Sequence, residues 1–339
     1  MLSNLEELDE FLAEPSDALI DFMRQLEGDL VILGVSGKMG PTLARRAVNA
    51  VRRAGVNKRV IGVARFSDPV VQAKLQAWGV EAVTCDLNDA EAVRQLPQVP
   101  NVVFMAGRKF GTQGSEDLTW AMNALLPWNV AEHYRHSRIV AFSTGCVYPL
   151  RTIEEGGCVE TDASAPVGEY SQSCLARERV FQYAARQFGT KIVLFRLNYA
   201  IDLRYGVLHD VAAQIRDGKP VCDTVGYFNV IWQGDANDYA LRSLAFADNP
   251  PTVLNATGPE TASIRQVAVA LAQQLNLPFR FTDTFRDAAY LSNAGRLFDL
   301  MGYPSVPLDR MIRWQAEWLR SGGATLGKPT HFETNDGKF

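Results

Sequence analysis

The sequence lacks the features that mark several large classes of protein. Its five cysteines are odd in number and scattered without CxxC spacing, which argues against a disulfide framework and against a zinc site. No apolar run approaches the roughly 18 residues of a membrane span. An HExxH pair and a nucleophile elbow are also absent, so metal-dependent or triad hydrolysis is disfavoured and we expect no metal.

The composition is that of a folded protein with a large core. Of the 339 residues, 47% are hydrophobic and 21% are charged, which excludes a mainly disordered chain and leaves room for two ordinary domains. Lysine plus arginine number 34 against 38 acids, a formal net charge of −4, and no basic cluster compensates locally. We therefore expect neither a nucleic-acid partner nor a membrane partner.

The two ends of the chain differ from its middle. Residues 1–28 are acidic and amphipathic and lack the basic start and apolar stretch of a signal peptide, so we expect a cytoplasmic protein with an N-terminal helical extension. This extension could pack on a sheet edge, cover a dimer or dock a partner. The stretch after Ser321 is Gly-rich and polar and is expected to form a loose arm.

From residue 29 the chain alternates short apolar runs with segments of helical spacing. The predicted strands are Leu30–Leu33, Val60–Val63, Val80–Thr84, Val102–Met105, Ile139–Phe142 and Ile192–Phe195. Continuous apolar strands separated by helices predict a parallel sheet that is covered on both faces, a doubly wound α/β fold of Rossmann type.

The regular alternation ends near residue 200, where prolines begin to separate shorter elements. We expect a Rossmann domain over 29–200, with a later strand and helix at about 228–247 returning to it. A smaller, mostly helical substrate lobe follows over 201–325, with amphipathic helices at 262–275 and 307–320, and a tail over 326–339.

The strongest local motif follows the first strand directly and opens a helix. Glycines 34, 37 and 40 form GxxGxxG within Gly34-Val35-Ser36-Gly37-Lys38-Met39-Gly40. This spacing lets backbone N–H groups approach a pyrophosphate at the positive end of the helix, whereas a merely tight turn would not need the strand–loop–helix context. The motif predicts a dinucleotide site.

The ends of the second and third strands bear on the choice of dinucleotide. Arg65 stands where an NAD site usually has an acid, and an arginine can pair with a 2′-phosphate, so NADP is favoured over NAD. The alternative is a solvated surface arginine. Asp86 could bind the adenine amino group or could simply cap its strand.

Together these motifs resemble the extended short-chain dehydrogenase/reductase family, also called NAD-dependent epimerase/dehydratase. The resemblance extends from residue 29 to about 320. It rests on the glycine loop, on Asp86-Leu87, on Phe104-Met105-Ala106-Gly107, on Asn123, on Phe142-Ser143-Thr144-Gly145-Cys146-Val147-Tyr148 and on Arg196-Leu197-Asn198-Tyr199. It implies a nicotinamide cofactor held by Gly34, Ser36, Gly37, Lys38, Met39, Gly40, Arg65, Asp86, Leu87, Met105, Ala106, Gly107, Asn123, Tyr170 and Asn198.

The family's chemistry uses a Ser/Thr hydroxyl, a tyrosine and a lysine four residues after the tyrosine. Thr144 and Tyr170 match the first two and are the expected catalytic residues, but position 174 holds a cysteine. A tyrosine has a pKa of about 10 and needs a nearby positive charge to act as a base at neutral pH. Cys174 supplies none and is interpreted as a small buried residue, with a reactive redox cysteine as the alternative.

Three interpretations of this departure remain open. The enzyme is active and the charge comes from the oxidised nicotinamide, from Lys109 or from Arg108; or turnover is slow; or the protein binds the nucleotide without turnover, as a regulatory or interaction protein. The first two describe an NAD(P)-dependent oxidoreductase or epimerase.

The resemblance also bears on substrate and assembly. Phe228 stands where relatives that act on nucleotide-linked sugars carry a diphosphate-binding arginine, so a small sugar, sugar acid or polyol is expected. The candidate substrate contacts are Arg108, Lys109, Thr144, Cys146, Asn198, Arg204, His209 and Gln233. Two long helices, about 116–136 and 169–188, correspond to those that form the family's dimer, so a homodimer is expected.

Overall fold

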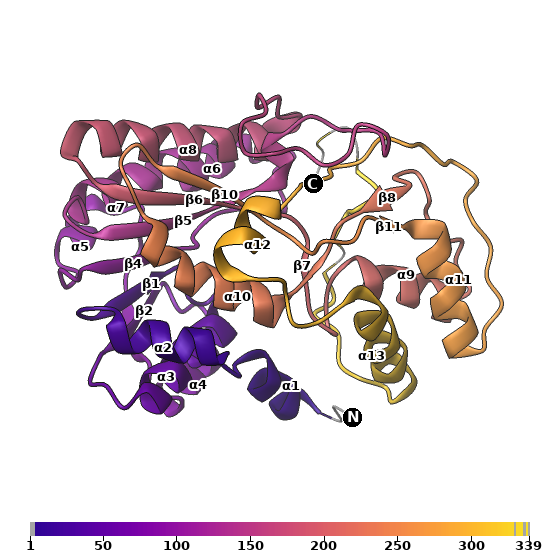
Figure 1. Cartoon of the computed structure of the whole chain (residues 1–339), viewed down its shortest axis with the longest axis horizontal. Helices are drawn as coiled ribbons and strands as arrows, with labels where there is room; N and C mark the ends of the chain where they lie inside the picture. The colour runs from indigo at the N-terminus through magenta and orange to yellow at the C-terminus, as the bar shows by residue number, and fades with distance from the viewer. Residues whose placement is uncertain (1–3, 329, 335–336, 338–339) are drawn as a thin grey trace.

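A seven-stranded sheet forms the centre of the computed structural model, which describes residues 4–328, 330–334 and 337 (Figure 1). The strand order is β10-β6-β5-β4-β1-β2-β3 and all neighbours are parallel. The strands are β1 (Leu30–Leu33), β2 (Val60–Ala64), β3 (Glu81–Thr84), β4 (Asn101–Phe104), β5 (Arg138–Thr144), β6 (Lys191–Leu197) and β10 (Thr252–Ala256). The predicted doubly wound sheet and its six predicted strands are therefore confirmed.

Helices cover both faces of this sheet, and alternate residues of each strand point into separate cores. In β1, Leu30 and Ile32 join one core, whereas Val31 and Leu33 join the other, which explains why the strand is apolar throughout. The first face is covered by α2 (Asp17–Gln25), α3 (Gly40–Ala54), α4 (Pro69–Ala77), α10 (Gln233–Arg242) and α12 (Gly295–Met301). The second face is covered by α5 (Ala90–Arg94), α6 (Glu116–Trp120), α7 (Leu126–His133) and α8 (Gly168–Phe188).

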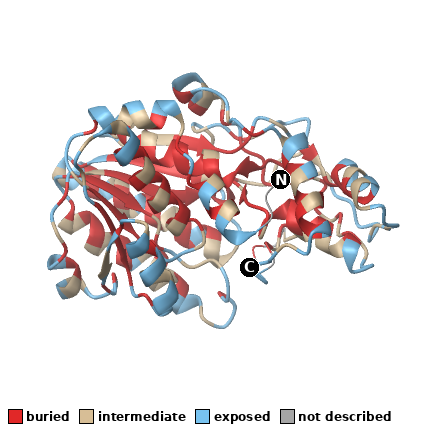
Figure 2. Ribbon diagram, turned by 90° about the horizontal axis from the view of Figure 1, so that it is seen from below, coloured by how far each residue is buried: buried red, intermediate tan, exposed pale blue. Residues whose placement is uncertain are grey.

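A smaller lobe lies beyond the carboxyl ends of the strands and has a core of its own (Figure 2). It contains α9 (Val207–Arg216), α11 (Ile264–Leu275) and α13 (Leu308–Arg320) together with β7 (Ala200–Ile201), β8 (Tyr227–Phe228), β9 (Ile231–Trp232) and β11 (Ala262–Ser263). The helices predicted at 262–275 and 307–320 are thus α11 and α13. No helix within the described ranges is long and apolar enough to cross a bilayer.

The strand that returns to the central sheet was misplaced by the sequence prediction. The strands near residue 228, β8 and β9, pair in separate two-stranded sheets, while β10 (Thr252–Ala256) joins the central sheet beside β6. Each of the two early strands is only two residues long, so neither supplies the longer apolar run that a central strand needs. The predicted returning helix is α10, which packs against α3.

The N-terminal helices lie on the outer helical layer. Helix α2 packs against α3, and its Leu19 and Met23 belong to the core of the sheet. Helix α1 (Leu5–Leu12) instead contributes Leu8 and Leu12 to the core of the lobe. The extension was expected to pack on a sheet edge, cover a dimer or dock a partner. Its observed position matches none of these descriptions, because its two helices pack into two different cores.

One buried ion pair joins two central strands to helix α8. The Glu178 carboxylate, fully buried, accepts hydrogen bonds from Arg196 of β6 at 2.9 and 2.7 Å and from the Ser143 hydroxyl of β5. Arg196 also donates to the Tyr148 hydroxyl at 2.7 Å. Ser143 precedes Thr144, so the network fixes the strand end that carries a predicted catalytic residue.

We expect Glu178→Gln to destabilise the fold by about 3–5 kcal/mol, because it leaves the Arg196 charge buried without a counter-ion. Urea unfolding of the full chain measures this change. The matched control is Glu91→Gln, whose side chain is 80% exposed in its ion pair with Arg94, and whose cost should not exceed about 1 kcal/mol. Equal urea midpoints for the two variants would contradict the role assigned to the buried pair.

Candidate active site

The glycine loop after β1 has the close backbone contacts that only glycine allows. A Cβ atom at Gly34, where φ is +86°, would lie 2.7 Å from the backbone nitrogen of Ala106, and one at Gly40 would lie 2.2 Å from the Val35 carbonyl oxygen. Helix α3 begins at Gly40, and its N-cap Met39 makes no side-chain capping bond. The first N–H groups of α3 are therefore not capped by that side chain, which suits a phosphate group.

A cavity of about 200 Å³ lies beside this loop at the ends of β1, β2 and β3. Its lining residues are Gly34, Ser36, Gly37, Ala64, Arg65, Cys85, Asp86, Leu87, Asn88, Met105, Ala106, Gly107, Met122 and Leu126. Nine of the predicted cofactor contacts are in this set. The donor and acceptor groups at its ends fit the adenosine half of a dinucleotide.

Asp86 and Arg65 influence one another in this cavity. The Asp86 carboxylate accepts hydrogen bonds from the backbone and side-chain nitrogens of Asn88, each at 3.0 Å. The backbone bond from Asn88 is the largest cause that lowers the pKa of Asp86, and the nearby Arg65 charge lowers it further. Because Arg65 is exposed, its guanidinium is open to a phosphate from solvent.

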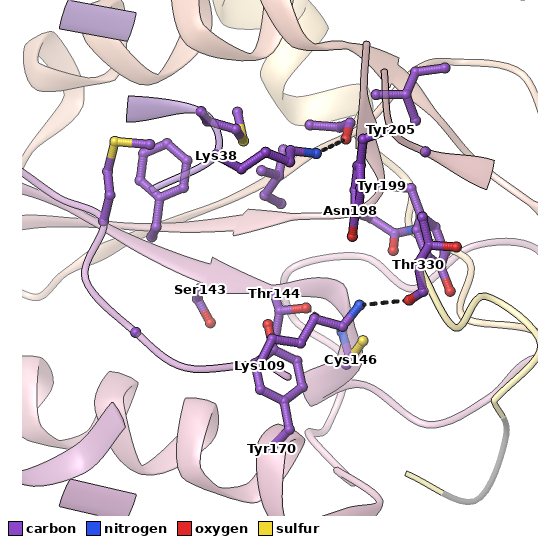
Figure 3. A pocket seen from close by; sticks show the side chains of 18 of the residues that line it. Lys38, Lys109, Ser143, Thr144, Cys146, Tyr170, Asn198, Tyr199, Tyr205 and Thr330 are labelled. Carbon is purple, nitrogen blue, oxygen red and sulfur yellow. Dashed lines mark hydrogen bonds between the residues drawn. The ribbon is translucent and has the colours of Figure 1, made fainter. Parts of the chain in front are cut away.

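A second cavity, of about 250 Å³, is shown in Figure 3. Met105 and Gly107 line both this cavity and the first. Its other lining residues are Lys38, Met39, Arg108, Lys109, Phe142, Ser143, Thr144, Cys146, Tyr170, Arg177, Leu197, Asn198, Tyr199, Ala200, Ile201, Tyr205, Gly206 and Thr330. Both predicted catalytic residues are in this set. The two cavities together run along the carboxyl ends of the strands, where open α/β sheets bind ligands.

Thr144 and Tyr170 meet in this second cavity. Thr144 ends β5, and Tyr170 lies in the first turn of α8, with a hydrogen bond between their side chains. Burial raises the pKa of Tyr170 well above its ordinary value, and the Thr144 bond and the Arg177 charge offset part of that rise. In this environment Tyr170 holds its proton and is a proton donor.

Cys174 occupies the next turn of α8 and is a neutral, buried thiol. Its exposed fraction is 1%, and burial raises the pKa of Cys174 to about 11. The thiol is hydrogen bonded to Tyr170. These features fit a small buried residue and provide no positive charge, so the cation that acts on Tyr170 must come from elsewhere.

Arg177 supplies a positive charge one turn farther along the same face of α8. Its guanidinium donates to the Phe142 carbonyl at 2.9 Å and to the Asn123 side-chain oxygen at 2.6 Å. Within the described part of the chain, no carboxylate forms an ion pair with it. Sequence reasoning missed Arg177, although residues i, i+4 and i+7 share one helix face and the spacing from Tyr170 could have indicated it.

Asn123 is a positioning residue and lines neither cavity. It is fully buried in a π-helical turn (Ala121–Leu125) between α6 and α7. Its side-chain oxygen accepts from the Arg108 backbone nitrogen and from Arg177, and its nitrogen donates to the Arg108 carbonyl and to the Ser173 hydroxyl. All these bonds hold the loop after β4 against α8. The Asn123 side chain, predicted to contact the cofactor, lines neither cavity.

Two lysines enter the second cavity from different elements. Lys38 of the glycine loop donates to the Ala200 carbonyl at 3.1 Å, and its nitrogen lies 3.6 Å from the centre of the Tyr205 ring. Lys109 donates to the Thr330 carbonyl at 3.4 Å, and its nitrogen lies 5.8 Å from the centre of the Tyr170 ring. Of the two loop cations predicted to replace the missing lysine, Lys109 is thus beside the tyrosine, whereas Arg108 donates to the Gly111 carbonyl.

Three predicted substrate contacts do not line the cavity. Arg204 forms ion pairs with Asp202 and Asp9, and Gln233 is buried with its nitrogen bonded to the Thr42 hydroxyl. His209 is buried and contacts Leu203, Gln315 and Thr325. Their side chains bind neighbouring elements of the fold, so the structure does not bring these three residues together with the other predicted contacts. The other predicted contacts, including Cys146 and Asn198, do line the cavity.

The described part of the C-terminal tail packs against this cavity. Thr330 lines it and donates from its backbone nitrogen to Asp210 at 2.8 Å, and Phe332 is buried in the core of the lobe. The expected loose arm is therefore wrong for residues 330–332, because an apolar ring anchors them. Residues 329, 335–336 and 338–339 of the predicted tail lie outside the described residues, as do residues 1–3 of the predicted extension.

Comparisons with known proteins show the family and the fold of the chain. Residues 30–244 match the model of the NAD dependent epimerase/dehydratase family. Similar solved structures include a UDP-glucose 4-epimerase of Thermus thermophilus in complex with NAD, at 18% identity, a TM-score of 0.70 and coverage of 86% of this chain and 99% of that one. A dTDP-glucose 4,6-dehydratase of Bacillus anthracis in complex with NAD has 14% identity, a TM-score of 0.72 and coverage of 87% and 97%. A search of curated protein sequences gave no match.

We expect Lys38 to react as a neutral amine near physiological pH. Burial is the main cause that lowers the pKa of Lys38 to about 7, and the Lys109 and Arg204 charges lower it while Asp202 and Asp210 oppose them. Acetylation by trace acetic anhydride, followed by mass spectrometry, should therefore level off above about pH 8 at Lys38, whereas an ordinary lysine with a pKa of about 10.4 keeps gaining reactivity.

The exposed Lys219 provides the comparison in the same digest. This measurement does not depend on access to the cavity, because only the pH dependence is compared. A Lys38 profile that still rises above pH 9 would contradict the lowered pKa.

Proposed function

Because this chain belongs to the NAD-dependent epimerase/dehydratase family, we propose that it is an NAD(P)-dependent oxidoreductase or epimerase that acts on a small carbohydrate-like substrate. The observation that carries the proposal is the hydrogen bond between Thr144 and Tyr170, in a cavity that adjoins the cofactor loop. A hydroxyl pair at this place can bind the oxygen of an alcohol or carbonyl while its carbon faces the cofactor.

The side chains divide the reaction between them. The nicotinamide cofactor, when bound, accepts or supplies the hydride. Thr144 orients the substrate oxygen, and Tyr170 donates a proton to that oxygen in the direction of reduction or receives one in the direction of oxidation. Since burial raises the pKa of Tyr170, oxidation depends on positive charge around the phenol, and reduction depends on it less.

The positive charge that the missing lysine would have supplied is assigned to Arg177 and Lys109. Arg177 lowers the pKa of Tyr170, and Lys109 lies over its ring. Arg177 reaches the cavity from α8, and Lys109 reaches it from the loop after β4. The bonds of Asn123 hold these two elements in place. This assignment favours an active enzyme among the three interpretations of Cys174.

The size of the cavity and one lobe residue support a small substrate. The cavity of about 250 Å³ is small for a drug-sized ligand, whose pockets begin at about 300 Å³. Phe228, at the position where an arginine was sought, is 1% exposed and belongs to the core of the lobe. The two solved structures named above bear the names of enzymes that act on UDP- and dTDP-linked sugars, but a likeness at 18% and 14% identity carries only the fold.

A homodimer in the cytoplasm completes the proposal. Apolar side chains are exposed along the two helices expected to pair, with Leu118 50% exposed, Leu125 70% and Tyr183 47%. A dimer that buries these helices against their symmetry mates would remove this apolar surface from water.

The rival function is a nucleotide-binding regulatory protein without turnover. The feature that favours it is Cys174, a thiol that stays protonated at the position where the family has an ammonium group. A regulatory protein would bind the dinucleotide in the same cavity but would not catalyse its reduction or oxidation. Binding and turnover must therefore be measured separately.

The deciding experiment titrates the full chain with NAD and NADP by calorimetry and then follows reduced cofactor and products with a panel of sugars, sugar acids and polyols. We expect affinity for at least one dinucleotide, favouring NADP if Arg65 binds its phosphate. Tyr170→Phe and Thr144→Val should lower kcat by about 10²–10⁴-fold while dinucleotide binding remains measurable, because each removes a hydroxyl that takes part in proton transfer. Tight cofactor binding with no product from any substrate would favour the regulatory protein.

The role of Arg177 predicts a shift in pH dependence. Removing its charge raises the pKa of Tyr170, so Arg177→Met should move the rising limb of the oxidation rate to higher pH by roughly one unit, about tenfold in rate at neutral pH. Arg177→Lys should restore part of the rate, and Cys174→Lys should increase the rate of the native chain.

The control variant is Arg179→Met, which removes an exposed arginine of the same helix. A fall in rate at all pH values without a shift of the profile would assign Arg177 a purely structural role.

A further inference from the structure

The charged side chains that line the second cavity are all basic. Its lining includes four basic residues, Lys38, Arg108, Lys109 and Arg177, and no aspartate or glutamate from the described part of the chain. The remaining lining residues are apolar or neutral polar. A neutral sugar or polyol does not require such a surplus of positive charge, whereas an anion does.

Asp202 and Asp210, the two carboxylates whose charges raise the pKa of Lys38, are bound to other groups. Asp202 forms an ion pair with Arg204 at 2.7 Å and is buried. Asp210 accepts from the backbone nitrogen of Thr330 at 2.8 Å and from its hydroxyl. Neither carboxylate lines the cavity, and neither lies within ion-pair distance of Lys38.

The two lysines bring like charges into one space. Lys38 enters from the glycine loop, and Lys109 enters from the loop after β4, beside Cys146 and Thr330 (Figure 3). The Lys109 charge is one cause that lowers the pKa of Lys38. An anion bound near both ammonium groups would remove this repulsion and restore the charged form of each.

We propose that the substrate is a sugar acid whose carboxylate binds to Lys109 and Lys38 while its reacting hydroxyl or carbonyl binds to Thr144 and Tyr170. This proposal rests on the proposed function and narrows its substrate class. Since the Lys109 nitrogen lies 5.8 Å from the centre of the Tyr170 ring, the carboxylate lies within a few bonds of the reacting carbon. The carboxylate of the hydroxy or keto acid is thus bound next to Thr330, which lines the same cavity.

The cofactor's own phosphates are the competing explanation for the charge of Lys38, since this residue belongs to the glycine loop. Lys109 separates the two explanations because it belongs to the loop after β4 and not to the glycine loop, and it donates to the Thr330 carbonyl. A role in binding pyrophosphate would make the cofactor affinity depend on both lysines. A role in binding substrate would make only the acid affinity depend on Lys109.

The test is calorimetry of the full chain with its dinucleotide at saturation. The probes are D-gluconate and D-threonate, each compared with the alcohol of the same carbon number, D-glucitol and D-threitol, and with glucose 6-phosphate as a phosphate arm. We expect each acid to bind at least about tenfold more tightly than its alcohol, a difference of about 1.4 kcal/mol. Lys109→Gln should abolish this preference and leave the dinucleotide affinity within about twofold.

Lys38→Gln should weaken acid binding to a similar extent, while the matched control Lys219→Gln, at a side chain 69% exposed, should change nothing. Acids that bind no better than alcohols, or a sugar phosphate that binds better than either acid, would overturn the proposal and leave the proposed function intact. Loss of dinucleotide affinity in Lys109→Gln would assign the charge to the cofactor. No dinucleotide affinity in the native chain would overturn the proposed function itself.

Discussion

The active-site geometry depends on the buried contact between Glu178 and Arg196. This pair joins β6 to α8, and the Ser143 hydroxyl adds the end of β5. Thr144 follows Ser143 directly, and Tyr170 lies two turns before Glu178 on the same helix. A single buried carboxylate therefore sets the distance between a strand end and a helix, and the two hydroxyls meet because that distance is fixed.

Electrostatics around Tyr170 are supplied by several elements in place of one lysine. Arg177 acts from the helix and Lys109 from the loop after β4, and Asn123 holds the two elements together. In this arrangement the positive charge near the phenol comes from two elements of the fold, and a neutral thiol occupies the position of the usual ammonium group.

The sheet could be predicted because its strands are apolar on both faces and its glycine loop follows a strand directly. The lobe was harder, because its strands are two residues long and their pairing depends on contacts far apart in sequence; the strand Thr252–Ala256 was consequently assigned to the wrong unit. In the site, Thr144 and Tyr170 follow from local motifs. Arg204, His209 and Gln233 have chemistry that suits a ligand equally well, and only the structure shows that their side chains bind other parts of the protein and do not line the cavity.

The N-terminal extension has a consequence for how substrates reach the cavity. Helix α1 shares the core of the lobe and helix α2 shares the core of the sheet. Asp9 of α1 forms an ion pair with Arg204, and the short connection between the helices is held by the bond from Arg46 to the Leu12 carbonyl and by the bonds from Ser16 to Asp238. A hinge rotation that moved the lobe away from the sheet would have to separate one of these helices from the apolar core into which it packs. We therefore expect substrates to enter and leave by small movements of the loops around the cavity, while the lobe and the sheet move together.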